Sequence, residues 1–126
     1  MDLAGPFPPD LDGHIYAIMC VDVFSKWVEV GKLPSKRALR TGEWFYQEVI
    51  SRWGKPQAVR VDNGGEWYGE FCQLLNSLDI KIVHSTVGNS RANGQAERMI
   101  RTFKDIVQCT GCAIDGYWSD ALPMAV

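Results

Sequence analysis

A short alternating run followed by a turn is the feature that most constrains this fold. Residues 58–61 (AVRV) alternate between two faces and include two β-branched valines, so they predict a strand. The Asn-Gly-Gly of residues 63–65 then supplies a turn, which places Asp62 at the carboxyl end of that strand. Ligands of open α/β sheets bind just outside such strand ends, because the connecting loops leave a crevice there. Asp62 is therefore the first candidate for a functional carboxylate.

The rest of the chain alternates between strand and helix patterns. Residues 14–23 (HIYAIMCVDV) form a nearly continuous apolar run, which is typical of a strand buried on both faces. Residues 27–33 (WVEVGKL) alternate, and the short link before them predicts an antiparallel hairpin. The other predicted elements, in chain order, are a strand tail in residues 1–9, a helix over 39–53, a helix over 71–78, a strand over 80–84, a polar loop over 85–93, an amphipathic helix over 96–107, and the opening of a truncated helix at 117–126. This order predicts an α/β fold, a mixed sheet flanked by helices, in a single domain over residues 1–126.

Composition narrows the function classes. A chain with 46% hydrophobic and 22% charged residues is typical of a globular soluble protein, and no window reaches the ~18 apolar residues of a membrane span. A net charge of −2 argues against holding nucleic acid by bulk charge alone, but allows a local basic face. The pair Cys109 and Cys112 has no second pair or nearby histidine, so neither zinc nor a disulfide is expected, and Cys20 and Cys72 are interpreted as buried thiols. No signal-peptide pattern occurs, which favours an intracellular location.

Two further acids extend the candidate site. Asp2 comes shortly before a Gly-Pro turn, and Glu97 opens the amphipathic helix. Three acids far apart in sequence, two on strand ends and one on a helix, are a plausible cage for divalent cations. Glu97, Arg101 and Lys104 fall at positions i, i+4 and i+7, so they share one polar stripe of the helix. The sequence thus predicts an acid and two cations along one exposed edge.

Three motifs carry a family resemblance. They are MDLAGP at residues 1–6, VDNGGEW at 61–67 and NGQAER at 93–98. In this order and at these intervals they resemble the catalytic core of retroviral and long-terminal-repeat retrotransposon integrases, nearest those of the gypsy-type elements. Residues 21–29 (VDVFSKWVE) resemble the second and third strands of that lineage, so the similarity covers essentially the whole chain. The resemblance implies a ribonuclease-H-like fold, a five-stranded mixed sheet flanked by helices.

The same resemblance implies an activity and a metal. Family enzymes are polynucleotidyl transferases that trim the 3′ ends of element DNA with water and join these ends to target DNA. By resemblance Asp2, Asp62 and Glu97 would be the catalytic acids that bind two Mg²⁺ or Mn²⁺ ions, with Asp2 as the bridging ligand. Hard cations prefer carboxylates and water. Two ions ~3.5 to 4 Å apart can activate the attacking oxygen and stabilise the leaving one.

Partners and location follow from the resemblance as well. Arg101 and Lys104 align with family residues that touch the element's DNA end, Asn93 aligns with a flexible-loop residue near that end, and Asn63 follows the second acid. Arginine and lysine at these positions would hold phosphates rather than read bases. The implied partners are double-stranded DNA, both element ends and target, and further copies of the chain in a homodimer or higher oligomer, with no membrane. The implied location is nuclear, in the pre-integration complex of a retroelement.

The sequence departs from the family pattern in two places. The interval between Asp62 and Glu97 is one residue shorter than usual, and the loop before the helix reads VGNSR where a proline-containing segment is common. A core without the family's other domains is expected to have little complete integration activity. Two alternatives stay open: a domesticated module that keeps the fold for dimerisation or scaffolding without catalysis, and a ribonuclease-H-type nuclease acting on RNA:DNA hybrids.

Simpler roles compete with each assignment. An aspartate before Asn-Gly is, taken alone, typical of a turn residue, and Glu97 could complement the helix dipole or pair with Arg101. Asp22 is the rival for the first acid; motif order favours Asp2, and Asp22 is expected to hydrogen-bond turn amides after Val23. The tryptophans are predicted to lie in the core or in a subunit interface rather than to stack on bases: Trp27, Trp44, Trp53, Trp67 and Trp118.

Overall fold

The computed structural model describes residues 1–85, 94–113 and 118–122. The chain packs as two compact units. The first, here called the antiparallel-sheet unit, comprises residues 2–35 and 90–126. The second, the parallel-sheet unit, comprises Met1 and residues 36–89. Each unit has its own sheet, its own helices and its own buried side chains.

Three antiparallel strands form the sheet of the antiparallel-sheet unit. They are β1 (Asp2–Ala4), β2 (Tyr16–Val21) and β3 (Val28–Leu33), with β2 in the middle. The apolar run predicted to be a buried strand is β2, in which three consecutive residues, 17–19, are buried. The turn between β2 and β3 closes through a hydrogen bond from the Lys26 amide to the Asp22 carbonyl at 2.8 Å, which confirms the predicted hairpin.

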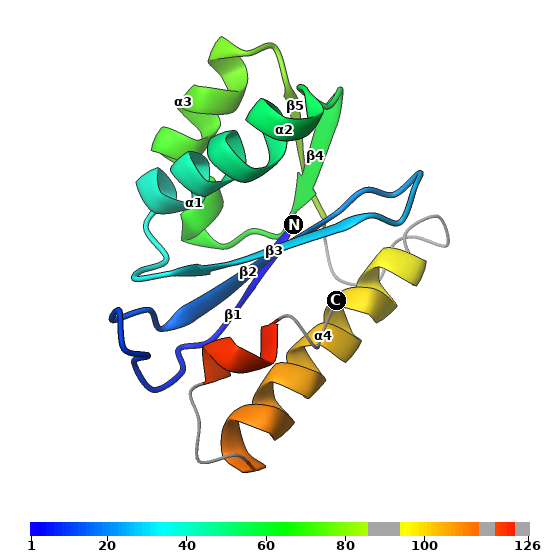
Figure 1. The fold of residues 1–126 in the computed structure, drawn as a ribbon. Helices are drawn as coiled ribbons and strands as arrows, with labels where there is room; N and C mark the ends of the chain where they lie inside the picture. The colour runs from blue at the N-terminus through cyan, green and yellow to red at the C-terminus, as the bar shows by residue number, and fades with distance from the viewer. Residues whose placement is uncertain (86–93, 114–117, 123–126) are drawn as a thin grey trace. The chain divides into compact units, whose positions relative to one another are not determined.

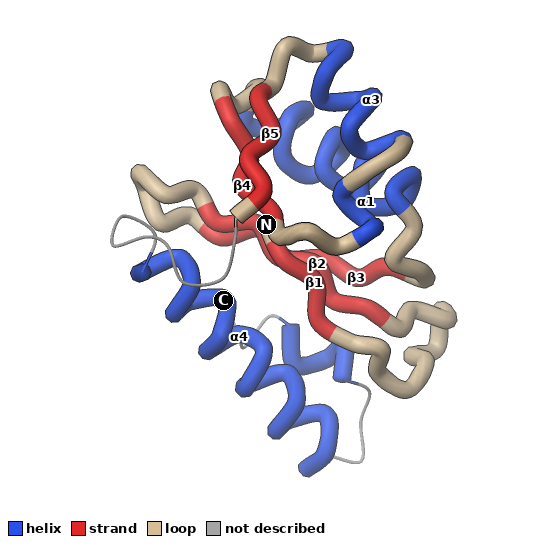
Figure 2. The backbone as a smooth tube through the Cα atoms, turned by 180° about the vertical axis from the view of Figure 1, so that it is seen from behind, coloured by secondary structure: helices blue, strands red, loops and turns tan. Residues whose placement is uncertain are grey.

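Helix α4 (Gly94–Ala113) packs against this sheet (Figures 1 and 2). Its apolar stripe contributes Phe103 and Val107 to a buried cluster that includes Ala4 of β1. Successive side chains of a strand point to opposite faces, so Asp2, two residues before Ala4, faces the same helix. The amphipathic helix predicted from the sequence is therefore present, and its apolar side covers the sheet face that carries Asp2.

A short 3₁₀ turn, η3 (Trp118–Ala121), completes this core. The ring of Trp118 stacks on that of Phe7 with centroids 4.7 Å apart, and its indole nitrogen donates to the Pro8 carbonyl at 2.8 Å. The proline-rich loop after β1 is thus held by an aromatic side chain from the other end of the chain.

A helical run opens the parallel-sheet unit. It consists of α1 (Ala38–Phe45), one turn of π-helix, η1 (Tyr46–Ile50), and α2 (Ser51–Trp53). Gly54, with φ of 87°, ends the run, because this backbone conformation favours a residue without a side chain. The helix predicted over residues 39–53 is confirmed, with a π turn in its middle.

Two parallel strands form the sheet of this unit. β4 (Ala58–Val61) pairs with β5 (Lys81–His84), and the connection contains a 3₁₀ turn, η2 (Gly65–Trp67), and α3 (Glu70–Ser77). Helices α1 and α3 lie side by side in both the ribbon and the tube view (Figures 1 and 2). The most deeply buried side chains are Phe45, Val61, Trp67, Phe71 and Leu75. The rings of Trp67 and Phe71 meet edge to face, with centroids 5.2 Å apart.

The five predicted strands are all present in a mixed α/β arrangement. Among the described residues, backbone hydrogen bonds join them as a three-stranded antiparallel sheet and a two-stranded parallel sheet. Most of the predicted loop at 85–93 and half of the segment 117–126 lie outside the described residues. No helix in the described part of the chain is both long enough and apolar enough to span a bilayer.

Side-chain burial tests the remaining sequence predictions. Trp44, Trp67 and Trp118 are buried as predicted, whereas Trp27 and Trp53 are 55% and 57% exposed and are not part of the core of this chain. Both exposed rings have polar neighbours: the Trp27 indole donates to Glu29 at 2.8 Å, and the guanidinium of Arg52 lies 5.4 Å from the Trp53 ring centroid. Two thiols expected to be buried, Cys20 and Cys72, are half-buried, and desolvation raises the pKa of the Cys20 thiol.

Candidate active site

Asp62 lies one residue past the carboxyl end of β4, as the sequence predicts. Its Oδ1 accepts two hydrogen bonds at 2.8 Å, one from the Gly64 amide and one from the indole nitrogen of Trp67. The Trp67 ring is fully buried, so it gives the carboxylate a rigid anchor. No described residue donates to Oδ2. Asp62 is therefore a turn residue, as the simpler interpretation expected. Only its Oδ1 is used by the turn, however, and its Oδ2 has no donor among the described residues.

Residues at and near the end of the neighbouring strand, β5, surround Asp62. Val61 of β4 lies opposite His84 of β5, and Nδ1 of His84 lies 3.0 Å from the Asp62 carbonyl oxygen. The His84 ring stacks on Tyr68 with centroids 4.6 Å apart and planes inclined by 4°. Tyr68 in turn donates to Oδ1 of Asn63 at 3.5 Å, at the outer limit of a hydrogen bond. Asn63, predicted to contact DNA, is exposed beside this aromatic wall.

Sequence reasoning missed Trp67, Tyr68 and His84 as parts of this site. A signal for His84 was present, since it ends a strand that was itself predicted, and carboxyl ends of parallel strands share one edge. Trp67 had no such signal. Its position five residues after Asp62 becomes informative only when the 3₁₀ turn η2 folds the indole back toward the carboxylate.

Asp2 is held by a cation. Its Oδ2 lies 2.8 Å from Nζ of Lys104 on α4, and its Oδ1 accepts the amide of Leu3 at 2.8 Å. The two side chains are 26% and 36% exposed, so the pair is partly shielded from water. Lys104, predicted to contact DNA, is thus paired in this structure with a predicted metal ligand.

The other predicted residues of α4 are exposed. Glu97 lies in the first turn and receives no hydrogen bond from the described residues, and the described part of the chain has no ion pair between it and Arg101. Seven residues, about 10 Å of helix, separate Glu97 from Lys104 along one stripe. Because Asp2 pairs with Lys104, the structure brings Asp2 to the polar stripe that Glu97 begins. Asn93 lies outside the described residues.

The three predicted acids divide between the units. Asp62 belongs to the parallel-sheet unit, while Asp2 and Glu97 belong to the antiparallel-sheet unit. All three offer carboxylate oxygens, which are the ligands that Mg²⁺ and Mn²⁺ prefer. The open Oδ2 of Asp62, next to an Oδ1 locked by two donors, fits a ligand for such an ion. The donor set of this chain therefore suits a hard divalent cation.

Asp22, the rival first acid, is a turn residue. It follows the end of β2, is exposed, and accepts hydrogen bonds from the Ser25 hydroxyl at 2.6 Å and from the amides of Phe24 and Ser25 at 3.3 and 3.4 Å. The Ser25 hydroxyl, followed by these amides, lowers the pKa of the Asp22 carboxyl. The expected bonds to turn amides are confirmed, and the expectation that Asp22 lies inside a buried strand is wrong, because β2 ends at Val21.

A second acidic cluster lies between β1 and β2. Asp10, Asp12 and His14 each offer one ligand atom, and these atoms lie within 4.8 Å of one another. The buried Asp10 carboxylate accepts the amides of His14 and Asp12 at 2.8 and 3.0 Å and the ammonium of Lys32 at 3.1 Å. Burial alone would raise the pKa of Asp10, but these hydrogen bonds outweigh it and hold the pKa well below its usual range. Lys32 supplies the positive charge here, so we interpret the cluster as structural.

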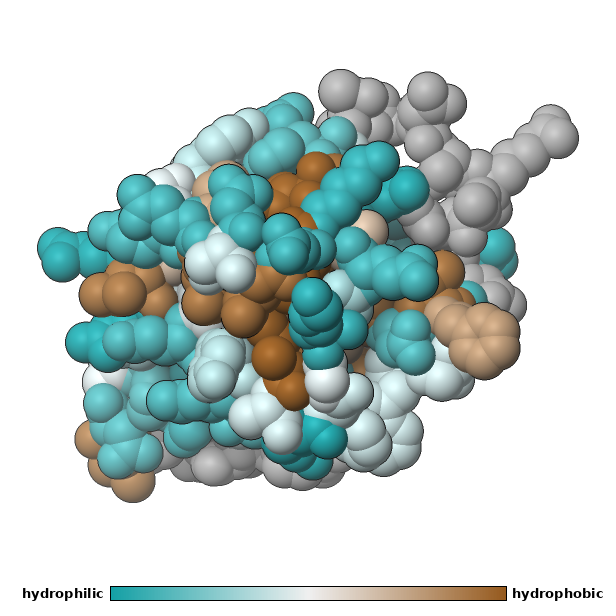
Figure 3. Space-filling model, turned by 90° about the horizontal axis from the view of Figure 1, so that it is seen from above, coloured by the Kyte–Doolittle hydropathy of each residue, from teal (hydrophilic) through white to brown (hydrophobic). Residues whose placement is uncertain are grey.

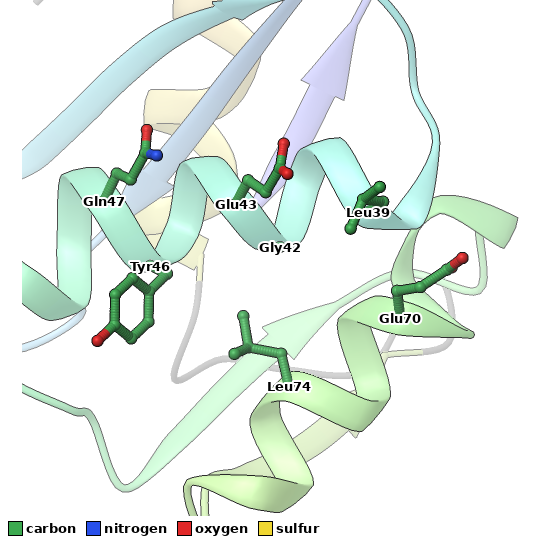
Figure 4. A pocket seen from close by; sticks show the side chains of 7 residues that line it. All are labelled: Leu39, Gly42, Glu43, Tyr46, Gln47, Glu70 and Leu74. Atoms are coloured by element: carbon green, nitrogen blue, oxygen red, sulfur yellow. The ribbon is translucent and has the colours of Figure 1, made fainter.

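One groove lies in the parallel-sheet unit, between the α1–η1 run and α3 (Figure 4). It has a volume of about 320 Å³, and its lining is mostly apolar, with two carboxylates at its rim. The lining residues are Leu39, Gly42, Glu43, Tyr46, Gln47, Glu70 and Leu74. The space-filling view shows hydrophobic surface gathered among hydrophilic side chains (Figure 3). None of the predicted acids lines the groove.

The sequence of this chain matches that of a known protein family. The profile of the integrase core domain matches residues 1–90, which include Asp2 and Asp62. The Pol polyprotein of Radiation murine leukemia virus is 31% identical over 122 residues, a match that covers 94% of this chain and 21% of that protein. A match of that extent also includes the region of Glu97. The chain spans between 6% and 21% of the length of the retroviral polyproteins that it matches.

Solved structures agree on the fold. The catalytic core domain of BIV integrase superposes with a TM-score of 0.68 at 23% identity, covering 87% of this chain and 71% of that one. The catalytic core domain of HTLV-2 integrase, solved in complex with magnesium in a trimeric form, gives a TM-score of 0.64 at 24% identity, covering 87% and 70%. The fold is therefore ribonuclease-H-like, as the resemblance implied. With the profile match and these relatives together, the chain belongs to the integrase core domain family.

Proposed function

We propose that this chain is the catalytic core of a polynucleotidyl transferase that trims the 3′ ends of element DNA and joins them to target DNA. The observation that carries the proposal is Asp62, placed at a parallel strand end with one oxygen locked by Gly64 and Trp67 and the other open. Family membership supports the reaction class, and the motifs around Asp2 and Glu97 supply the other two acids.

Each acid has a defined role in this proposal. Asp2, Asp62 and Glu97 would hold two Mg²⁺ or Mn²⁺ ions through carboxylate oxygens, and the magnesium complex of the HTLV-2 core supports this choice of metal. When bound, such ions would stabilise the negative charge on the attacking and leaving oxygens of an in-line displacement. Trp67 and the Gly64 amide keep the Asp62 carboxylate oriented, which reduces the reorganisation that ligand binding requires.

The proposed partners are DNA and further copies of the chain. Asn63, Asn93, Arg101 and Lys104 are the proposed DNA contacts, with the cations holding phosphates. The trimeric form of the HTLV-2 core and the intasome of simian T-cell lymphotropic virus, both of similar fold, support assembly as a homodimer or higher oligomer. The proposed location is nuclear, because integration into chromosomal DNA takes place there.

Mn²⁺-dependent disintegration of a branched DNA tests this function, because this reaction is the reverse of strand joining. We expect Asp62→Asn, Asp2→Asn and Glu97→Gln each to reduce the rate to background. Asp22→Asn is the matched control, since it neutralises an exposed turn aspartate that has no role in the proposal, and it should keep the wild-type rate. Full activity of Asp62→Asn would refute the assignment. Loss of activity in Asp22→Asn, with activity retained in Asp2→Asn, would show that Asp22 and not Asp2 is the first acid.

A scaffold without catalysis is the second candidate. The ion pair between Asp2 and Lys104 favours it, because the ammonium already compensates the charge of the Asp2 carboxylate without a metal ion. A melting curve with increasing Mn²⁺ separates the two. Ligands that bind only the folded state raise the melting temperature. A catalytic core should therefore be stabilised by Mn²⁺, and a scaffold should show no change.

A further inference from the structure

The ion pair between Asp2 and Lys104 joins two residues to which the proposed function gives separate roles. Asp2 is a proposed metal ligand and Lys104 a proposed phosphate contact, yet Nζ of Lys104 lies 2.8 Å from Oδ2 of Asp2. The Leu3 amide occupies Oδ1 at 2.8 Å. Both oxygens of this carboxylate therefore have a donor before any ion is bound.

Asp2 differs in this respect from the other two acids. The donors to Asp62 are a backbone amide and an indole, both neutral, and Glu97 receives no hydrogen bond from the described residues. Of the three, Asp2 is the acid whose carboxylate is paired with a cation in the described part of the chain. A divalent ion bound to Oδ2 would lie within a few ångströms of the ammonium, where two positive charges repel each other strongly. The ion and Lys104 would therefore compete for this oxygen.

The side chain of Lys104 can move away from Asp2. Its side chain is 36% exposed, it has four rotatable carbon bonds, and its charge is a compact ammonium that water or a phosphate can solvate. It also stands on the same helix stripe as Arg101, one turn away, where an anionic backbone would meet both cations. Release from Asp2 would therefore turn Lys104 from an internal counter-ion into a free cation on an exposed edge.

We propose that Lys104 is the built-in counter-ion of the metal site: it neutralises Asp2 until a divalent ion binds, and the ion then frees it for a DNA phosphate. This inference rests on the proposed function. It makes Lys104 a positioning residue with two consequences. Lys104 weakens divalent-ion binding, and through Lys104 the ion strengthens DNA binding, a coupling that must be reciprocal.

Mn²⁺ binding by the full 126-residue chain, followed by water-proton relaxation, tests the first consequence. Exposed ion pairs contribute up to about 1 kcal/mol, so Lys104→Met should bind Mn²⁺ roughly fivefold more tightly than the wild type. Arg101→Met removes the same charge one turn earlier without touching Asp2, and its affinity should stay within about twofold of the wild type. Lys104→Arg keeps the counter-ion and should bind like the wild type. Equal affinity in the wild type and Lys104→Met would overturn the inference.

Fluorescence anisotropy with a labelled DNA duplex tests the second consequence. Wild-type affinity should rise when Mn²⁺ replaces a chelator, and Arg101→Met should be weaker overall but keep that rise. Lys104→Met should lose most of it, and an undiminished rise in this variant would contradict the coupling.

Asp62→Asn separates failure of the inference from failure of the proposed function. If Asp62→Asn abolishes Mn²⁺ binding while Lys104→Met matches the wild type, the metal site stands and Lys104 is an ordinary surface ion pair. If the wild type, Lys104→Met and Asp62→Asn all fail to bind Mn²⁺, the proposed function and the inference fall together.

Discussion

The two units hold their candidate acids in different ways. In the parallel-sheet unit, Asp62 is exposed, and a buried indole and a backbone amide orient it without compensating its charge. In the antiparallel-sheet unit, Asp2 is partly buried and an ammonium neutralises it. The difference lies in charge compensation, because both carboxylates already have one oxygen fixed by a neutral donor. A strand-end acid that keeps its charge exposed is prepared for an ion, whereas a paired acid must first lose its partner.

Removing a large buried side chain from each unit would test how far the units are energetically separate. Trp67→Ala and Phe103→Ala should each lower the free energy of unfolding by about 3 to 5 kcal/mol, since both rings are almost fully buried and leave a cavity. Hydrogen exchange read by mass spectrometry should show the loss of protection mainly in the unit that carries the substitution. Equal loss in both units would mean that they unfold as one cooperative body.

Acid should act on the antiparallel-sheet unit through Asp10. Its pKa in the folded state lies below the unfolded value of about 3.9, so the stability it contributes is complete above that pH and is lost as the pH falls below it. Asp10→Asn should cost about 1 to 3 kcal/mol at neutral pH, because it weakens hydrogen bonds to a buried carboxylate.

Denaturant unfolding between pH 3 and 7 would measure this effect, and Asp10→Asn should flatten the acid limb. Asp79→Asn is the control, since Asp79 is exposed and its positive φ of 56° suits asparagine as well. An acid limb that is equally steep in Asp10→Asn would show that other carboxylates govern acid unfolding.

Asp10 is a buried polar residue of the antiparallel-sheet unit, and Thr41 is a buried polar residue of the parallel-sheet unit that carries no charge. This residue is fully buried, and its hydroxyl lies 2.9 Å from the carbonyl oxygens of both Ala38 and Glu66, which ties α1 to η2. Thr41→Val should lower stability by about 0.5 to 1.5 kcal/mol, because it removes one net hydrogen bond and leaves the Glu66 carbonyl without that donor. Urea unfolding measures the change, with the exposed Ser77→Ala as a control that should have a smaller effect. No loss in Thr41→Val would show that η2 is held without this bond.

The smallest expected effect is a gain in stability at the groove. Gly42 lies within α1, and a Cβ there would lie 3.5 Å from Leu74 and 3.8 Å from Phe71, which is ordinary contact. Gly42→Ala should therefore stabilise the chain by about 0.5 to 1 kcal/mol through helix propensity. Gly69→Ala is the opposite case, because φ of 59° disfavours a side chain, and it should destabilise. A lower melting temperature in Gly42→Ala would mean that α1 and α3 tolerate no added methyl group.

Much of the fold was predictable because local patterns carried it. The apolar run that became β2, the alternating AVRV that became β4, and the apolar stripe of α4 each reflect the period of one element. Burial of individual aromatic residues was less predictable. Trp27 and Trp53 are large apolar residues, yet both lie at the surface. There the Trp27 indole donates to Glu29, and the Arg52 guanidinium lies over the Trp53 ring.

The candidate site divides in the same way. The position of Asp62 at a strand end was predictable because Asn-Gly-Gly marks the end of the strand before it. Asp10 was overlooked because nothing in its loop indicates a buried carboxylate. The motifs predicted roles for Asp2, Glu97 and Lys104, but not that Asp2 and Lys104 form an ion pair.

The amino-acid sequence was enough to predict the order of the elements and the family, because element order follows from short-range periodicity and the family from motif spacing. It also nominated Asp2, Asp62 and Glu97 as the candidate acids. Tertiary structure alone decided which donor reaches which carboxylate: the Trp67 indole for Asp62, Lys32 for Asp10 and Lys104 for Asp2. The physical reason is that a hydrogen bond or ion pair depends on ångström-scale distances between side chains. Packing of one element on another sets these distances, and no local pattern encodes them.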